Sequence, residues 1–378
     1  MTTTSATSSV TGPSPEQNNR YRLLVRSIGR ADAAVLGALR RVRPAPDIEL
    51  ANILYRAPAE LVSGLDLDIG TRLRDILLQT GVDVELTPAG EPFEPGVGEY
   101  EVALVIRRFD RIMEIVEATS RIMGIPADAA MKILWATPAV LLGGVSLATV
   151  EALRARFAKL GVEVDASRTA TARFDIAVEV SDESTRQLLQ MQLRENNVTA
   201  TRSGPNSYLA TDIESRAATR IWEQLSRTSA SSRVLNRDFE RFDVRLDTAP
   251  TSADAAEWLV SVTGMPTAVA GTALGKTPFV LAESVPLETM VSLLEGAHAR
   301  GGQASAVLLP LQSFSLRVKE GGDRKAALQW VELIAGPQDV ERFVRGKPEM
   351  HGPFTKTQAR WLQAELRRHE IASHLLER

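Results

Sequence analysis

Three groups of residues in this sequence are of types that could do chemistry: a glycine segment with a lysine, four histidines and two arginine clusters. The glycine segment, Ala270–Thr277 (AGTALGKT), ends like a phosphate-binding loop, which needs a glycine, four residues and then Gly-Lys followed by Thr or Ser. Ala270 stands where the first glycine should be. We interpret the segment as the end of a helix that Pro278 terminates, so we expect no nucleotide site there.

The histidines do not form a recognisable metal or catalytic set. His369 and His374 are five residues apart, whereas two metal ligands on one helix face are typically four apart. The chain has no cysteine, which excludes disulfides, zinc–thiolate clusters and thiol nucleophiles. We therefore predict no catalytic, metal-binding or cofactor-binding residues and no cofactor, and we do not expect an enzyme.

The arginine clusters are stronger candidates for an interaction site. One cluster ends a predicted helix, where the helix dipole stabilises cations, and the other lies at a predicted helix start, where the dipole is unfavourable to them. A phosphate or an acidic protein is therefore a candidate partner of the second cluster. The first cluster consists of Arg40, Arg41 and Arg43, and the second of Arg107, Arg108 and Arg111.

Overall charge and hydropathy narrow the classes of partner. The formal net charge is −3, so there is no overall basic field and we do not expect nucleic acid as a partner. The most apolar stretch, Ile133–Val145, is too short to span a bilayer, so we expect no membrane insertion. Residues 1–19 are rich in Ser and Thr without a basic start or an apolar core, which predicts a disordered tail and not a signal peptide. We expect a cytoplasmic protein.

The elements that would position these residues recur along the chain as a weak internal repeat. Each copy begins with an alternating run led by an aromatic residue, which predicts a half-buried strand, and carries a proline about 30 residues later. The runs are Tyr21–Val25, Tyr100–Ile106, Phe174–Val180, Phe242–Thr248 and Phe314–Glu320. The prolines are Pro58, Pro138, Pro205, Pro278 and Pro348.

Two helical segments separate the first strand from the proline in four of the copies. In the first copy they are Ala31–Val42 and Asp47–Arg56. After the proline come a short extended segment, an amphipathic helix and a last strand. This order, β-α-α-β-α-β, predicts an α+β fold built as a tandem array of small modules, each a three-stranded sheet with helices on one face.

The third copy departs from this order. It is shorter between its first strand and its proline, and the segment VTATRSGPNSYLATDI, from Val198, is typical of a hairpin and not of a helix. Two interpretations stay open: a β-α-β-β-α-β module, which would be ferredoxin-like, or a degenerate copy of the others.

The repeat divides the chain into five modules, a tail and a linker. Residues 88–99 contain enough proline and glycine to predict an unstructured spacer, about which the first module could swing. The predicted parts are the tail 1–19, module 1 at 20–87, the linker 88–99, module 2 at 100–168, module 3 at 173–239, module 4 at 240–309 and module 5 at 311–378.

Module 1 carries a family resemblance. The run Ala38–Thr87 resembles the C-terminal domain of the bacterial large-subunit ribosomal stalk protein in its second helix closing on Ala57-Pro58, its Leu-Val-Ser-Gly turn from Leu61 and its third helix closing on Gly81. Met123–Asp165 of module 2 repeats the pattern. The Clp protease adaptor that reads N-terminal degradation signals shares this architecture.

The resemblance implies a bacterial protein and a module that binds other proteins. Arg40 matches an arginine with which the stalk domain engages translation factors, whereas Gly37 stands at the position of a family lysine. The stalk protein's own dimerising domain is absent, as is the Asn-Asp turn of the adaptor.

The segment ILWATPAVLLGG, from Ile133, is more apolar than its counterparts in the other modules. Trp135 stands where Tyr55 and Arg345 stand in modules 1 and 5, so two interpretations stay open: a contact beyond its own module, or an ordinary core position. We take Trp135, Leu141 and Leu142 as candidate interaction residues beside the arginines.

Together these features favour a non-catalytic tandem-repeat scaffold that mediates protein–protein interaction, with copies of the same chain left open as partners. The alternative hypothesis is a translation-linked factor that contacts ribosomal GTPases or RNA through the arginine clusters.

Overall fold

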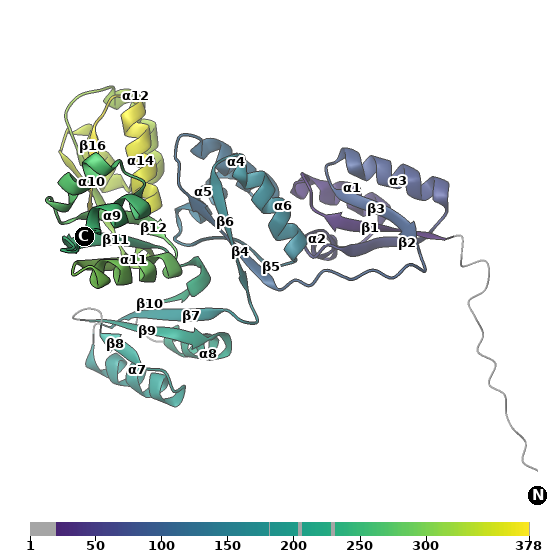
Figure 1. Ribbon diagram of the computed structural model, residues 1–378. Coiled ribbons are helices and arrows are strands. Elements are labelled where there is room, and N and C mark those ends of the chain that lie inside the picture. The colour runs from purple at the N-terminus through teal and green to yellow at the C-terminus, as the bar shows by residue number, and fades with distance from the viewer. Residues whose placement is uncertain (1–19, 181, 203–205, 228–230, 378) are drawn as a thin grey trace, which may run out of the picture. The chain divides into compact units, whose positions relative to one another are not determined.

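The computed structural model describes residues 20–180, 182–202, 206–227 and 231–377 (Figure 1). The predicted tail and the repeat proline Pro205 lie outside the described residues. The chain divides into two compact units. The first contains the described residues up to Tyr100 with Ala118–Pro126 and Gly143–Arg156, and the second contains Glu101–Glu117, Ala127–Leu142 and the described residues from Phe157 onward.

The fold class is α+β, as the hydrophobic periodicity predicts. Several small antiparallel sheets follow one another along the chain, each accompanied by helices (Figure 1). In modules 1, 2, 4 and 5 the sheet has three strands and the first strand of the module lies in the centre. The predicted element order β-α-α-β-α-β is therefore confirmed for these four modules.

The first two modules have their elements close to the predicted positions, although the first helix of module 1 begins later than expected, as a 3-10 turn. The elements of module 1 are β1 (Tyr21–Ser27), η2 (Ala33–Val35), α1 (Leu36–Val42), α2 (Asp47–Tyr55), β2 (Ala59–Leu65), α3 (Leu67–Gln79) and β3 (Asp83–Pro88). Those of module 2 are β4 (Tyr100–Ile106), α4 (Ile112–Met123), α5 (Ala127–Trp135), β5 (Ala139–Val145), α6 (Leu147–Ala158) and β6 (Val162–Arg168).

Module 3 has the β-α-β-β-α-β order, so the first of the two open interpretations is correct. Its four strands lie in the order β10-β7-β9-β8, and β8 and β9 form the predicted hairpin. This is the ferredoxin-like arrangement. The elements are β7 (Arg173–Glu179), α7 (Glu183–Glu195), β8 (Ala200–Arg202), β9 (Ser207–Glu214), α8 (Ser215–Leu225), β10 (Ser231–Asn236) and η3 (Arg237–Phe239).

Modules 4 and 5 return to the three-stranded pattern. Module 4 consists of β11 (Phe242–Thr248), α9 (Ala255–Thr263), α10 (Thr267–Leu274), β12 (Phe279–Val285), α11 (Leu287–Ala299), β13 (Gln303–Leu308) and η4 (Leu309–Leu311). Module 5 consists of β14 (Phe314–Val318), α12 (Arg324–Ile334), α13 (Pro337–Val344), β15 (Glu349–Phe354), α14 (Lys356–Arg368) and β16 (Ser373–Glu377).

Strand β11 shows how alternation in the sequence builds a module core. Val244 and Leu246 are fully buried, and they pack with Trp258 of α9 and Leu293 of α11. Asp243, directly before Val244, points to the opposite face of the sheet because successive side chains of a strand alternate. The apolar face of the sheet is therefore covered by its own helices, and the polar face is left for contacts with other modules.

The repeat prolines follow the second helix of each three-stranded module, as predicted. Helices α2, α5, α10 and α13 end three or four residues before their prolines. The peptide bonds before Pro58, Pro138 and Pro278 are cis. In module 5 the cis bond lies before Pro353 and not before the repeat proline Pro348.

The linker contains no helix or strand between residues 89 and 99, but it contacts module 1 at several points. The guanidinium carbon of Arg22 lies 4.6 Å from the centre of the Phe93 ring, and the Gly96 N–H donates to the Pro58 carbonyl at 2.7 Å. These contacts hold the linker against module 1 at its middle and near its end.

Within the described residues, no helix combines the length and the apolar character that crossing a bilayer demands.

Candidate functional site

Within the first unit, module 2 contacts module 1 at the end of α2. Ser146, the residue before α6, donates its N–H to the Tyr55 carbonyl at 3.0 Å, and the Thr149 hydroxyl donates to the same carbonyl at 2.9 Å. The Tyr55 hydroxyl donates in turn to the Ile122 carbonyl at 2.7 Å. Burial raises the pKa of Tyr55. The carbonyl that α2 leaves without a helical partner at its last residue is thus satisfied by the start of α6.

The other end of α6 contacts module 1 as well. Arg156 donates from Nη1 to the Ala31 carbonyl at 2.9 Å. Desolvation lowers the pKa of Arg156, with the Asp32 carboxylate opposing that shift. Within the first unit, two points near the two ends of α6 therefore hold this helix against module 1.

Within the second unit, module 5 contacts module 2 at the end of α5. The Thr355 hydroxyl, just before α14, donates to the Trp135 carbonyl at 2.8 Å. The ring centroids of Trp135 and Trp361 lie 6.3 Å apart with a tilt of 58°. Trp361 is fully buried and Trp135 is half-buried. Trp135 thus meets a residue of another module of the same chain.

The two joints repeat one arrangement at the helix start. Tyr55 and Trp135 are the last residues of α2 and α5, and each gives its carbonyl to the third helix of another module. The donors lie in the first turn of α6 and just before α14, at Thr149 and Thr355.

The arrangement is also repeated at the helix end. Arg156 donates to the carbonyl of Ala31, and Arg368 of α14 donates to the carbonyl of Asp110. Ala31 and Asp110 are equivalent, since each lies four residues after the first strand of its module. The contact is heterologous, because the two modules of each joint use different surfaces. We call the contacting side of α6 or α14 the third-helix face, and the surface at the end of α2 or α5 the second-helix face.

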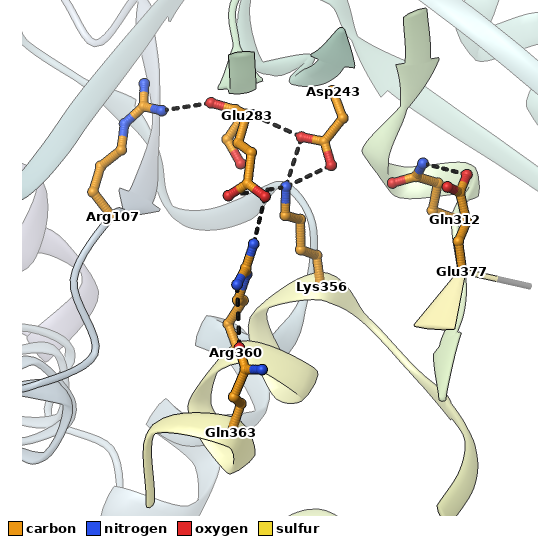
Figure 2. Close-up of polar contacts among 9 residues, drawn as sticks. Arg107, Asp243, Glu283, Gln312, Lys356, Arg360, Gln363 and Glu377 are labelled. Carbon is orange, nitrogen blue, oxygen red and sulfur yellow. Dashed lines mark hydrogen bonds and ion pairs between the residues drawn. The ribbon is translucent and has the colours of Figure 1, made fainter. Parts of the chain in front are cut away.

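A buried ion pair connects modules 4 and 5 (Figure 2). The Lys356 Nζ lies 2.6 and 2.5 Å from the two carboxylate oxygens of Asp243. Asp243 also accepts the N–H of Ser284 at 2.9 Å, where the backbone of β12 takes a positive φ of 53°. Lys356 is buried, so this pair lies in an environment of low dielectric where its two charges depend on each other.

Glu283 extends this cluster to module 2 (Figure 2). Its carboxylate pairs with Arg360 of α14 and lies 3.8 Å from the Lys356 Nζ. Its carbonyl accepts a hydrogen bond from Arg107 at 3.1 Å, while the Arg107 guanidinium binds both carboxylate oxygens of Glu163 at 2.8 and 3.1 Å. Modules 2, 4 and 5 therefore share one polar network.

A cavity of about 580 Å³ lies beside this network. Its walls combine apolar residues of β4 and η4 with polar residues of α14. Of its cations, Arg241 pairs with Asp165, and Arg107, Lys356 and Arg360 pair as described above. The volume suits a small molecule, but the pairing leaves these cations already neutralised.

The remaining candidate arginines are mostly paired with nearby carboxylates. Arg40 pairs with Asp47, Arg43 with Glu49, Arg108 with Asp110 and Arg111 with Glu114. Arg41 is exposed. Of the apolar candidates, Leu141 is buried and Leu142 is half-buried.

The segment Ala270–Thr277 ends a helix, as predicted. Helix α10 runs to Leu274, Gly275 caps it, and the strand β12 follows. A phosphate-binding loop joins a strand to the start of a helix, which is the reverse order. Among the described residues, no group of three or more His, Asp and Glu side chains could hold a metal ion.

The joint between modules 3 and 4 contains a pair of buried acids. Burial, and next the nearby Asp175 carboxylate, raise the pKa of Glu240 to about 8. Burial also raises the pKa of Asp175, which lies 3.4 Å from Arg237. The folded chain therefore keeps the proton of Glu240 to a higher pH than an exposed glutamate would.

Sequence reasoning did not identify Lys356, Asp243, Thr355 or Arg156 as contact residues. The sequence does contain one pattern that points to such contacts. In every module a polar residue follows the aromatic residue of the first strand, and it lies on the sheet face away from the helices. These five residues are Arg22, Glu101, Asp175, Asp243 and Ser315, and all are buried or half-buried.

Comparisons with family models, with curated proteins and with solved structures gave no match. The resemblance to the ribosomal stalk domain therefore stays a prediction.

Proposed function

We propose that this chain is a non-catalytic tandem-repeat scaffold that mediates protein–protein interaction. The observation that carries the proposal is the joint that occurs twice, between modules 1 and 2 and between modules 2 and 5. A module that offers both a second-helix face and a third-helix face can bind a neighbour on each side. Module 2 uses both of its faces within the chain.

Repetition of such modules suits binding better than catalysis. Linked sites gain avidity without any single site being strong. The charged groups around Glu283 form ion pairs with one another. Ion pairs that are fixed in this way hold the modules in position. The proposal includes a cytoplasmic location, with which the cysteine-free sequence is compatible.

The alternative, a translation-linked factor, would need its arginines free to meet ribosomal GTPases or RNA. Arg40, Arg43, Arg108 and Arg111 instead pair with carboxylates of their own modules. Exposed ion pairs are weak, so these arginines can exchange their carboxylate partners for another anion. Adding a competing anion is therefore the direct test of this alternative.

The experiment is capture of the tagged full-length chain from native lysate at low and at high salt, followed by cross-linking. A defined assembly that survives high salt is the result expected of a scaffold. The matched variant Arg40→Ser/Arg41→Ser/Arg43→Ser should leave that assembly intact. Recovery of ribosomal proteins at low salt only, and their loss from the variant, would establish the alternative in its place.

A further inference from the structure

The third helix of module 1 carries exposed apolar residues where its counterparts make a joint. Asp66 precedes α3 as Ser146 precedes α6, so Ile69 and Ile76 occupy the positions of Thr149 and Arg156. Ile69 is 51% exposed and Ile76 is 54% exposed. The two residues are seven apart, which places them on one side of the helix. The third-helix face of module 1 is thus apolar and uncovered.

The second-helix face of module 5 is uncovered too. Val344 is the last residue of α13, as Tyr55 is of α2 and Trp135 is of α5. Val344 is 64% exposed, whereas its two counterparts are half-buried in joints. Modules 1 and 5 therefore each expose an apolar residue at a position where other modules make a joint. One of these surfaces is a third-helix face and the other is a second-helix face, which are the two kinds of surface that meet in a joint.

The charges at these two surfaces have opposite signs. Ser146 and Thr355 use N–H or hydroxyl donors before their helices, but Asp66 presents a carboxylate at that point, in an exposed ion pair with Arg20 at 2.8 Å. Arg345 directly follows Val344, and its ion pair with Glu341 is exposed. Exposed ion pairs contribute little, so Asp66 and Arg345 can each exchange their present partner at small cost.

We propose that the third-helix face of module 1 binds the second-helix face of module 5 in a second copy of this chain, so that the joint is made a third time. The inference rests on the proposed scaffold function and names one partner for it. Because the contact uses different surfaces on the two copies, it is head-to-tail, and it produces a ring or an open filament.

The test is sedimentation velocity of the full-length chain over a wide range of concentration. The wild type should associate as concentration rises. Ile69→Arg/Ile76→Arg and Val344→Arg should each weaken association about tenfold or more, because each places a charge in the apolar contact. The matched control is Leu67→Arg/Leu78→Arg, which changes two exposed leucines on another side of the same helix and should associate like the wild type.

A mixture of the two face variants makes the test specific. Each variant keeps one intact face, so the mixture should form a one-to-one complex that does not grow further. Thermal melts check that every variant is folded. A wild type that stays monomeric throughout, face variants that associate like the wild type, or a mixture that forms no complex would each overturn the inference. If the wild type is monomeric and yet forms a salt-resistant assembly with other proteins, the scaffold function stands and this inference alone fails.

Discussion

The indole rings of Trp135 and Trp361 lie 6.3 Å apart in a tilted geometry, although one belongs to module 2 and the other to module 5. Tilted aromatic pairs contribute about 0.5–1.5 kcal/mol beyond the area that they bury. Beside them, Thr355 donates to the Trp135 carbonyl. Module 5 is therefore fixed to module 2, while modules 3 and 4 lie between the two along the chain.

Trp135→Ala should loosen this joint. We expect the variant to lose about 2 kcal/mol of stability, because the fully buried Trp361 loses its aromatic neighbour. Hydrogen exchange of the α14 amides should become faster. Trp222→Ala, which removes a more exposed tryptophan of module 3, serves as the control and should leave α14 unchanged. Equal protection of α14 in Trp135→Ala and wild type would show that the ring contact does not hold module 5.

The pair Lys356–Asp243 should behave as one unit. Lys356→Met alone should cost about 3 kcal/mol, because it leaves the Asp243 carboxylate without its cation. The double variant Lys356→Met/Asp243→Asn should cost less than the sum of the single changes. Urea unfolding followed by tryptophan fluorescence measures all four members of the cycle. Additive effects of the two single changes would mean that the two charges do not interact. The control is Arg345→Met, which removes an exposed ion pair and should stay within about 0.5 kcal/mol of the wild type in stability.

Gly96→Ala should release the linker from module 1. A Cβ atom at this position would lie 2.3 Å from the carbonyl oxygens of Arg56 and Ala57, so the backbone must move. We expect faster cleavage between residues 89 and 99 in limited proteolysis. Gly90→Ala is the control, since a Cβ there meets nothing within 4 Å. The same cleavage rate for both variants would contradict the close contact of Gly96 with module 1.

Glu240→Gln should change how stability depends on pH. The pKa of Glu240 rises from 4.5 to about 8 on folding, so between these values the folded chain keeps a proton that the unfolded chain has released. Stability therefore falls as the pH rises through this window, and the group has little further effect above it. The glutamine variant should gain melting temperature over the wild type at pH 8 and much less at pH 5.

Melting temperatures at pH 5, 6.5 and 8 measure this difference. Glu349→Gln is a useful contrast, because the Arg317 guanidinium lowers the pKa of the exposed Glu349. The effect of Glu349→Gln on the melting temperature should therefore depend on pH only in more acidic solution. A constant difference between Glu240→Gln and wild type from pH 5 to 8 would show that Glu240 does not hold its proton on folding.

The modules could be predicted from the sequence because their cores are local. Alternation in Phe242–Thr248 and the helical spacing of Met290, Leu293 and Leu294 depend on residues within one module. Even the hairpin of module 3 follows from a short segment. The joint of Trp135 with Trp361 depends on a module much further along the chain, and no periodicity records such a contact.

The position equivalent to Trp135 shows a second limit. Counting back from the repeat prolines pairs Trp135 with Arg345, but the helix ends pair it with Val344, so the prediction was wrong by one residue. The cause is one additional residue between α13 and Pro348. The ion pairs of the arginines could be predicted only in part. Glu114 lies one helical turn after Arg111, so their pair follows from the sequence, whereas Glu163 meets Arg107 only across the sheet.

The joint between modules 2 and 5 also has a consequence for synthesis of the chain. The Thr355 hydroxyl that binds the Trp135 carbonyl lies 220 residues further along. At 5–20 residues per second, the ribosome needs roughly 10–45 seconds to reach it. Throughout that time the nascent module 2 exposes an aromatic surface whose partner does not yet exist. Chaperone binding to nascent chains should therefore peak in this interval and end when the last helix emerges.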